Sequence, residues 1–262
     1  MRSSMRRVTR SLVMTIAAGG SLLAGCTARE KVTSFEQLEG RQFGIPTGTV
    51  VDQLVLSKLP KATFLYFTTV LDAAMAVKAG KVDVAAYDEP ILRNIAAKNP
   101  GLVVLPQKIT TDDYGFAMRL GDVEIKNAVD SVIRATKANG EYEQMIARWL
   151  PANGAPQPMP AIATGTNGVL RFGTAAVTEP FSFVDASRQG VGMDVEFAAR
   201  TAALLGRRLE IVNMDFGAMI PALMAGKVDM IGACITITAE RRKSVLFSDT
   251  YYVGGISALV RQ

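Results

Sequence analysis

The chain has 262 residues, of which 49% are hydrophobic and 20% charged, and this composition excludes a disordered, collagen-like or coiled-coil protein. A chain of this length more often folds into two packed lobes than into one. The formal net charge is +5, but residues 1–25 contain four arginines and no acid, so the remainder carries 25 basic and 24 acidic residues. A net charge of +1 gives no support for nucleic-acid binding.

The chain contains no histidine, which excludes histidine-based catalytic triads, histidine-ligated zinc or haem, and acid–base catalysis by imidazole. The phosphate-binding patterns GxxxxGK and GxGxxG are also absent from the sequence. We therefore expect no cofactor and no metal.

Residues 1–25 have the pattern of a secretory leader, with an arginine-rich start followed by a short run of small and apolar residues. The run ends Leu23-Ala24-Gly25-Cys26, which resembles the lipobox of bacterial lipoproteins and implies that Cys26 is lipidated. The alternative is a plain secretory signal in which Cys26 is incidental. If Cys26 carries lipid, Cys234 is left without a disulfide partner, and we interpret it as a buried wall residue.

In chain order, short buried strands are predicted at 41–46 and 82–87, and helices at 50–57, 70–79 and 91–99. An amphipathic stretch at 122–150 precedes a linker at 151–168 that holds four prolines and three glycines. The elements predicted beyond the linker are strands at 169–174, 209–213 and 228–234 and helices at 193–205 and 217–225. Strands that alternate with helices predict parallel sheets in two α/β lobes.

One internal echo favours two similar lobes, because the run AGKVD at 79–83 recurs at 225–229 between a predicted helix and a predicted strand. A glycine at this place is typical of a helix C-cap. The echo informs topology, and we assign no functional role to its lysines.

Several runs resemble polar amino-acid-binding proteins of bacterial ABC importers, the extracellular solute-binding proteins of family 3. GTAAVTEPFSFVD at 173–185, VGMDVE at 191–196 and TITAERRKSVLFSDTYY at 236–252 resemble the N-terminal half of that family. LEGRQFGIPTGT at 38–49, AGKVDVAAYDEP at 79–90 and NGEYEQMIARWL at 139–150 resemble its C-terminal half. The two halves therefore stand in reversed order.

The resemblance implies a type II periplasmic-binding-protein fold, an α/β fold whose two lobes each contain a mixed, mainly parallel sheet. The reversed order implies a circular permutation or pieces of two tandem copies, and we favour permutation. Only one of the two usual strands between the lobes would then survive, near 114–119, with residues 31–36 beside 257–262 at the cut. The expected organisation is a signal peptide at 1–25, a tether at 26–35, lobe 2 at 36–116, the C-terminal part of lobe 1 at 117–150, the linker at 151–168 and the N-terminal part of lobe 1 at 169–262.

A free amino acid presents a carboxylate and an ammonium, so its site needs a cation and, facing it, an acid. Arg241 can hold both carboxylate oxygens with its planar guanidinium, and the resemblance gives this role to the arginine of the run TITAER. The same match implies donors from Thr236 and a carbonyl from Ala233, with Cys234 lining the wall. Without it, Thr236 is an ordinary strand-end residue.

From the other lobe, Gly48 and Thr49 lie between a predicted strand and a predicted helix, so the N–H groups of Thr49 and Val50 can face an anion. Asp88 matches the acid of the family that accepts the ammonium, although a strand-end aspartate is also a common helix cap. Phe216 matches an aromatic residue that packs on the ligand side chain.

The sequence departs from the family at two positions. Thr178, which we also assign to the ligand site, stands where a stacking aromatic residue is common in the family. Ala175 stands where binders of basic amino acids carry an acid. The departures disfavour a basic ligand and leave the side-chain pocket open.

The resemblance implies a monomeric lipoprotein of the periplasm or cell surface, held to the membrane through Cys26, that captures a polar or small amino acid and delivers it to an ABC permease. It would perform no chemistry. One alternative is a cyclohexadienyl dehydratase-like enzyme, whose acid or base would come from Asp88, Glu179 or Glu240. The other is a ligand-sensing subunit of a signalling receptor.

Overall fold

The computed structural model describes residues 31–151 and 156–262. The predicted leader, the lipid site at Cys26 and residues 26–30 of the predicted tether lie outside the described residues, as do residues 152–155 of the linker. Among the helices that are described, none has the length and apolar character needed to cross a membrane.

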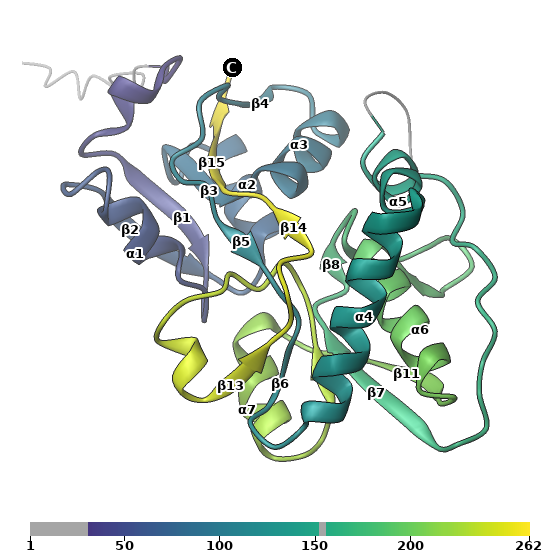
Figure 1. Ribbon diagram of the computed structural model, residues 1–262. Helices are drawn as coiled ribbons and strands as arrows, with labels where there is room; N and C mark the ends of the chain where they lie inside the picture. Colours follow the sequence, from purple (N-terminus) through teal and green to yellow (C-terminus); the bar gives the residue numbers. More distant parts are fainter. Residues whose placement is uncertain (1–30, 152–155) are drawn as a thin grey trace, which may run out of the picture. The chain divides into compact units, whose positions relative to one another are not determined.

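The first sheet has the strand order β2-β1-β3-β15-β4 (Figure 1). Strands β1 (Gln42–Pro46), β2 (Thr63–Phe67) and β3 (Val84–Asp88) are parallel, whereas β15 (Ile256–Arg261) runs antiparallel to β3 and β4 (Leu102–Val104). The helical elements of this lobe are η1 (Phe35–Leu38), α1 (Val51–Leu56), α2 (Val70–Lys78) and α3 (Glu89–Lys98). The predicted mixed, mainly parallel sheet is thus present.

The second sheet has the order β11-β7-β12-β6-β13. Strands β7 (Val169–Thr174), β11 (Arg208–Asn213) and β12 (Met230–Ile231) are parallel, and β6 (Ala117–Arg119) is antiparallel to β12 and β13 (Val245–Phe247). Its helical elements are α4 (Val123–Asn139), α5 (Glu141–Trp149), α6 (Met193–Leu204), η2 (Phe216–Ala218), α7 (Met219–Met224) and η3 (Arg241–Lys243). A small antiparallel sheet adds β8 (Val177–Thr178), β9 (Ser182–Val184) and β10 (Gly190–Val191).

Both five-stranded sheets have the same plan. In each, the first strand of the lobe pairs with the second and the third, and a strand from a distant part of the chain lies between the third and the fourth. That inserted strand is β15 in the first sheet and β6 in the second. Two lobes with one plan agree with the internal echo in the sequence.

The echo has the same structural role in both lobes. Gly80 and Gly226 follow α2 and α7 with φ angles of 71° and 68°, the left-handed conformation of a glycine that ends a helix. The aspartate that follows anchors the start of the first strand, because Asp83 accepts a hydrogen bond from the backbone N–H of Gln42 at 3.1 Å. Its counterpart, Asp229, accepts one from the backbone N–H of Arg171 at 3.0 Å.

Two segments of the chain connect the sheets, where we expected one. Strand β5 (Asp113–Tyr114) leads from the first sheet into β6, and β14 (Tyr252–Val253) leads from the second sheet into β15 (Figure 1). The two pair antiparallel, with Tyr252 opposite Tyr114, and the rings of these tyrosines stack with centroids 5.9 Å apart.

The prediction of a single connection was therefore wrong, as was the assignment of all of residues 169–262 to lobe 1. Strand β15 belongs to the sheet of lobe 2, where β3 and β4 pair with its two edges. Residues 31–36 consequently have no strand edge of 257–262 to pair with. Sequence runs mark where a strand forms, but the sheet that the strand joins depends on long-range packing.

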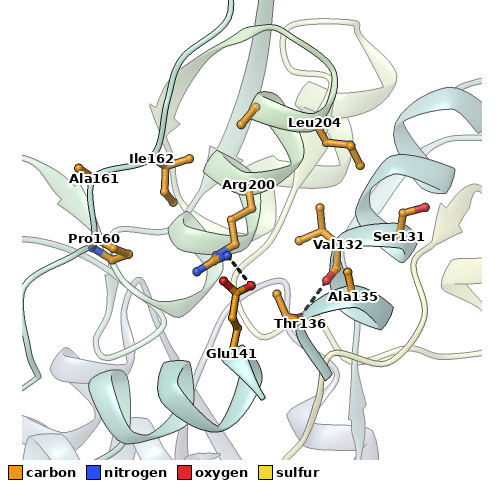
Figure 2. Close-up of a pocket in the computed structure, with 11 residues that line it drawn as sticks. Ser131, Val132, Ala135, Thr136, Glu141, Pro160, Ala161, Ile162, Arg200 and Leu204 are labelled. Carbon is orange, nitrogen blue, oxygen red and sulfur yellow. Dashed lines mark hydrogen bonds and ion pairs between the residues drawn. The ribbon is translucent and has the colours of Figure 1, made fainter. Parts of the chain in front are cut away.

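Residues 156–168 of the predicted linker follow the outer side of lobe 1 (Figure 1). The backbone N–H of Gln157 bonds to the carbonyl of Arg148 at 2.9 Å. Residues 160–162 then lie beside α4 and α6, and side chains of these segments line a shallow pocket that is open to solvent (Figure 2). At its wall, Arg200 pairs with Glu141 at 3.0 Å. This pocket contains none of the predicted binding residues.

Candidate functional site

Seven of the ten predicted ligand-binding residues line one small cavity, whose space of about 240 Å³ includes open solvent. They are Thr49, Val50, Asp88, Phe216, Cys234, Thr236 and Arg241. The first three come from the lobe of the first sheet and the others from the lobe of the second, so residues of both lobes form the cavity. Open α/β sheets place ligands at such strand ends.

Arg241 is the cation of this cavity. It begins η3, its side chain is buried, and its Nη1 donates a hydrogen bond to the carbonyl of Thr236 at 2.9 Å. The guanidinium carbon lies 5.7 Å from the centroid of the Phe216 ring. Burial lowers the pKa of Arg241, and Tyr87 and Asp88 oppose that effect. Within residues 31–151 and 156–262, Arg241 forms no ion pair with a carboxylate, so its charge is open to an anionic ligand.

Asp88 is the acid of the cavity. It is the last residue of β3 and is 4% exposed. The hydroxyl of Tyr114, from the connecting strand β5, donates a hydrogen bond to its Oδ1. Burial raises the pKa of Asp88 to about 7, although the Tyr114 hydrogen bond opposes the shift. A bound ammonium group would favour the ionised carboxylate.

The loop after β1 closes the cavity on its other side. Thr49 donates its hydroxyl to the carbonyl of Pro46 at 2.9 Å and accepts the backbone N–H of Val51 at 3.5 Å. Gly48 lines an adjoining cavity of about 250 Å³ together with Phe216 and Arg241. The hydroxyl of Thr49 therefore orders its own loop.

Gly48 also packs directly against Gly217 of the other lobe. Its φ angle is 76°, and a Cβ atom added to it would lie 2.5 Å from the Cα atom of Gly217. Only a glycine fits there. The structure thus has the lobes closed over the cavity.

A second contact between the lobes lies near the cis Glu179–Pro180 peptide. Lys98, at the end of α3, forms an ion pair with the carboxylate of Glu179 at 2.5 Å. Asn94 of the same helix donates to the Glu179 carbonyl at 3.5 Å. We call this group of three residues the latch.

A larger cavity, whose space of about 1000 Å³ includes open solvent, shares Tyr87 and Phe216 with the first. Ala175 and Thr178 lie in this wall, where the sequence departs from the family. The hydroxyl of Thr178 donates to the carbonyl of Ala175 at 2.9 Å. The remaining lining residues are Pro46, Thr68, Thr69, Val70, Val177, Asn213, Met214, Asp215 and Ala218.

Of the two neighbouring predicted residues Ala233 and Cys234, only Cys234 lines the cavity, as expected. Ala233 is fully buried and packs in the smaller core cluster with Leu223 and Val245. Cys234 lines the cavity, but its φ angle is 52°, in the left-handed region. Burial raises the pKa of its thiol well above the usual value, which leaves it protonated and unreactive.

Sequence reasoning missed several residues of the site. Tyr87, Val51 and Ile256 also line the cavity, and Tyr114 orients Asp88. Tyr87 precedes the predicted acid directly, which could have identified it. Ile256 could not be found in this way, because its strand was assigned to the other lobe.

A sequence model of the family described as bacterial extracellular solute-binding proteins, family 3, matches residues 170–262. The resemblance is therefore confirmed for this part of the chain. The arginine-binding extracellular protein ArtP of Bacillus subtilis (strain 168) is 41% identical over 83 residues, which are 32% of this chain and 32% of that protein. The chain spans about half or less of the length of the first curated relatives it matches.

A longer relative matches most of the chain. The virulence sensor protein BvgS of Bordetella bronchiseptica is 23% identical over 240 residues, which are 86% of this chain and 19% of the sensor. Among solved structures, the arginine-bound form of domain 1 from TmArgBP is 41% identical, covering 36% of this chain and 81% of that one. Its TM-score is 0.32, too low to carry an argument about lobe arrangement.

Proposed function

We propose that this chain, whose residues 170–262 match the extracellular solute-binding proteins of family 3, captures a polar or small amino acid between its lobes and delivers it to an ABC permease. One observation carries the proposal: a buried aspartate and an arginine that has no ion pair in the described part of the chain, from different lobes, line the same cavity. These are the charges that an α-carboxylate and an α-ammonium need.

In the proposed complex, Arg241 binds the ligand carboxylate, with donors from Thr236 in its own lobe and from Thr49 and Val50 in the other. Asp88 accepts the ammonium. A ligand held in this way makes its full set of contacts only when the lobes are closed, so binding shifts the population toward the closed state. Phe216 lies where the cavity meets the larger one, and the ligand side chain would pass its ring.

The proposed ligand has a neutral side chain. Ala175 and Thr178 place neither an acid nor an aromatic ring in the wall of the larger cavity. Its one carboxylate is that of Asp215, which is exposed to solvent. The similarity to arginine-binding ArtP covers a third of each chain, so arginine is an essential member of any ligand panel.

The decisive experiment is thermal unfolding of the protein with each of the twenty amino acids, prephenate and simple dicarboxylates. Ligand at about one hundred times its Kd should stabilise the folded state by about 2.7 kcal/mol. A shift with one or a few neutral amino acids would support the proposal, and a shift with arginine or lysine alone would overturn the neutral-ligand part. No shift with any amino acid would contradict the function.

Prephenate tests the enzyme alternative, because release of phenylpyruvate would establish a dehydratase. Two of the three candidate groups for that chemistry are held in ion pairs, Glu179 with Lys98 and Glu240 with Lys243. Because the third candidate, Asp88, is assigned to the ammonium of the ligand, we propose that the protein is not an enzyme.

A ligand-sensing role is the second candidate, and the match to a sensor over 86% of this chain favours it. Purification of the membrane-bound protein after chemical cross-linking would distinguish the roles. A permease in the cross-linked product supports transport, and a receptor with a kinase domain supports sensing.

We further propose that Cys26 is lipidated and anchors the protein at the outer face of a membrane. Cells fed radiolabelled palmitate should label the protein, and Cys26→Ser should remove the label and release the protein into the soluble fraction. A labelled Cys26→Ser protein would contradict this assignment.

The reversed order of the halves is proposed to be a circular permutation. Both sheets follow one plan, although each contains one strand from the other side of the 151–168 linker. The match to BvgS spans both halves in the order in which they stand in this chain. The alternative to a permutation is therefore a chain made of pieces of two tandem copies. A rearranged chain, with residues 169–262 first and joined to 31–150 by a flexible linker, should fold and bind the same ligand; failure to fold would contradict the permutation.

A further inference from the structure

The carboxylate of Asp194 links the start of α6 to the wall of the binding cavity. Asp194 is fully buried at the second residue of α6. Its Oδ2 accepts a hydrogen bond from the backbone N–H of Cys234 at 3.2 Å. Its Oδ1 forms no hydrogen bond within 3.5 Å among the residues that the structure describes, and neither does the hydroxyl of the neighbouring Tyr251. Burial raises the pKa of Asp194, and Tyr251 opposes that effect. A carboxylate in this environment is costly to bury, so its presence calls for a reason.

The residue that Asp194 holds has an unusual backbone. Cys234 has a φ angle of 52°, a conformation that side chains other than glycine rarely adopt. Strand β12 ends at Ile231, and the chain then turns through Cys234 to reach Thr236, which bridges to Tyr114. The left-handed residue is therefore the point at which the chain leaves the core and enters the cavity wall.

The turn determines where the ligand-binding groups lie. Cys234 and Thr236 both line the cavity, and the carbonyl of Thr236 accepts the hydrogen bond from the guanidinium of Arg241. A change in the turn would move the hydroxyl of Thr236 and the acceptor that orients Arg241 together.

We infer that Asp194 is a positioning residue for ligand binding, which holds Cys234 in its left-handed conformation and thereby fixes Thr236 and Arg241 in the cavity. The inference rests on the proposed function, because the affinity that Asp194 would control is the affinity for the proposed amino-acid ligand. Asp194 itself would not touch that ligand. It predicts a specific remedy for loss of the carboxylate: a glycine at 234 adopts the same φ angle without help.

The same helix supplies a matched control. Glu196 is also fully buried, but its carboxylate is neutralised by Arg148 at 3.0 Å and Arg200 at 2.9 Å and accepts the indole N–H of Trp149 at 2.7 Å. These partners lie within one lobe and away from the cavity. Changing Glu196 should therefore affect stability but not affinity.

The experiment compares Asp194→Ala, Asp194→Asn, Cys234→Gly, Asp194→Ala/Cys234→Gly and Glu196→Gln with the parent chain. Affinity is measured by titration calorimetry with each of the twenty amino acids. Asp194→Ala should weaken binding about tenfold or more, the loss expected for a hydrogen bond to a charged group. Asp194→Asn should bind nearly as the parent does, because the amide oxygen can accept the same N–H.

The double variant is the decisive comparison. Its affinity should lie within about threefold of that of Cys234→Gly alone, so the loss caused by Asp194→Ala should largely disappear when residue 234 is glycine. Such a result would show strong coupling between the two sites. Additive losses in the double variant would overturn the inference, as would an Asp194→Ala protein that binds like the parent. If Asp194→Ala does not fold, Asp194→Ser and Asp194→Ser/Cys234→Gly carry the same comparison, since serine is too short to reach the N–H.

A second measurement needs no ligand and separates this inference from the proposed function. In a Cys26→Ser background, Cys234 is the sole thiol, and it is 2% exposed. Its reaction with Ellman's reagent should be slow in the parent and in Glu196→Gln, and faster in Asp194→Ala under conditions where the protein stays folded. If no amino acid binds the parent chain, the proposed function fails; equal thiol reactivity in folded parent and Asp194→Ala would overturn the positioning role.

Discussion

The hydroxyl of Tyr114 donates a hydrogen bond to the carboxylate of Asp88, which ties the acid of the binding cavity to a strand that connects the lobes. Tyr114 stacks in turn on Tyr252 of the other connecting segment. The same hydroxyl accepts the backbone N–H of Gly255 at 2.9 Å. Movement of the lobes about these segments and the state of Asp88 are therefore physically coupled.

The buried acids predict an unusual dependence of stability on pH. Burial raises the pKa of Asp88 and of Asp194 from 3.8 to about 7. Between pH 4 and 7 the folded protein then binds more protons than the unfolded chain, so the stabilisation is fully present below pH 4 and is lost as the pH rises toward 7. Each group contributes up to about 4 kcal/mol across this window, at 1.4 kcal/mol per pKa unit.

Asp88→Asn should flatten this dependence, because an amide does not ionise. Urea unfolding at pH 4, 5, 6 and 7 measures the effect. The control is Glu89→Gln: hydrogen bonds from Lys108 and Arg93 lower the pKa of Glu89 despite the opposing effect of burial, so its stabilisation is lost only as the pH falls below about 4. If the plots of the free energy of unfolding against pH for Asp88→Asn and the parent are parallel between pH 4 and 7, the pKa of Asp88 is not raised in the folded protein.

Arg241→Ala should weaken amino-acid binding by about a hundredfold or more, because it removes the partner of a buried ligand carboxylate. Arg241→Lys should recover only part of the loss, since an ammonium lacks the planar fork of the guanidinium. Titration calorimetry with the amino acid that stabilises the parent measures both. Arg242→Ala is the control, because its exposed side chain lies over Phe247 rather than in the cavity. Unchanged affinity in Arg241→Ala would show that the carboxylate binds elsewhere.

The sequence was sufficient for the local features of the fold. The strand predicted at 169–174 is β7, because an apolar run between turn residues leaves few alternatives. The glycines at 80 and 226 end their helices as predicted. The predicted amphipathic stretch at 122–150 forms two helices, because Gly140 adopts a φ angle of 82° between them.

Features that depend on distant contacts could not be predicted. The run at 256–261 is recognisable as a strand, but its place between β3 and β4 depends on the two crossings between lobes. Asp194 has the pattern of an acid in the first turn of a helix, and its bond to Cys234, forty residues away, leaves no local mark. The predicted strand at 228–234 is ordered as a strand only at Met230–Ile231, because the turn at Cys234 takes the chain out of the sheet.

The latch should stabilise the closed state without stabilising the fold. Lys98 and Glu179 come from different lobes and form their ion pair where the lobes meet, so Lys98→Ala should favour the open state. Lys98 is half exposed, and an exposed pair is worth up to about 1 kcal/mol, so we expect affinity to fall about two- to fivefold at constant melting temperature. In 0.5 M NaCl the difference from the parent should shrink.

The control for the latch is Arg207→Ala, because Arg207 pairs with Glu124 at 2.7 Å within lobe 1. Its affinity for the ligand should equal that of the parent. If Lys98→Ala and Arg207→Ala have the same affinity, the ion pair between the lobes does not contribute to closure.

Gly48→Ala should prevent the lobes from closing fully. A Cβ atom at Gly48 would lie 2.5 Å from the Cα atom of Gly217 in the other lobe, and the φ angle of Gly48 is 76°. The left-handed backbone by itself makes alanine unfavourable, by about 1 kcal/mol.

Gly40 separates the two effects, because its φ angle is 75° and an added Cβ would meet nothing within 4 Å. Gly40→Ala should lose similar stability and keep its affinity, whereas Gly48→Ala should also lose affinity, by about tenfold or more, since it opposes closure. Small-angle scattering with saturating ligand should show a larger radius of gyration for Gly48→Ala than for Gly40→Ala. Equal radii and equal affinities in the two variants would mean that ligand binding does not require the approach of Gly48 to Gly217.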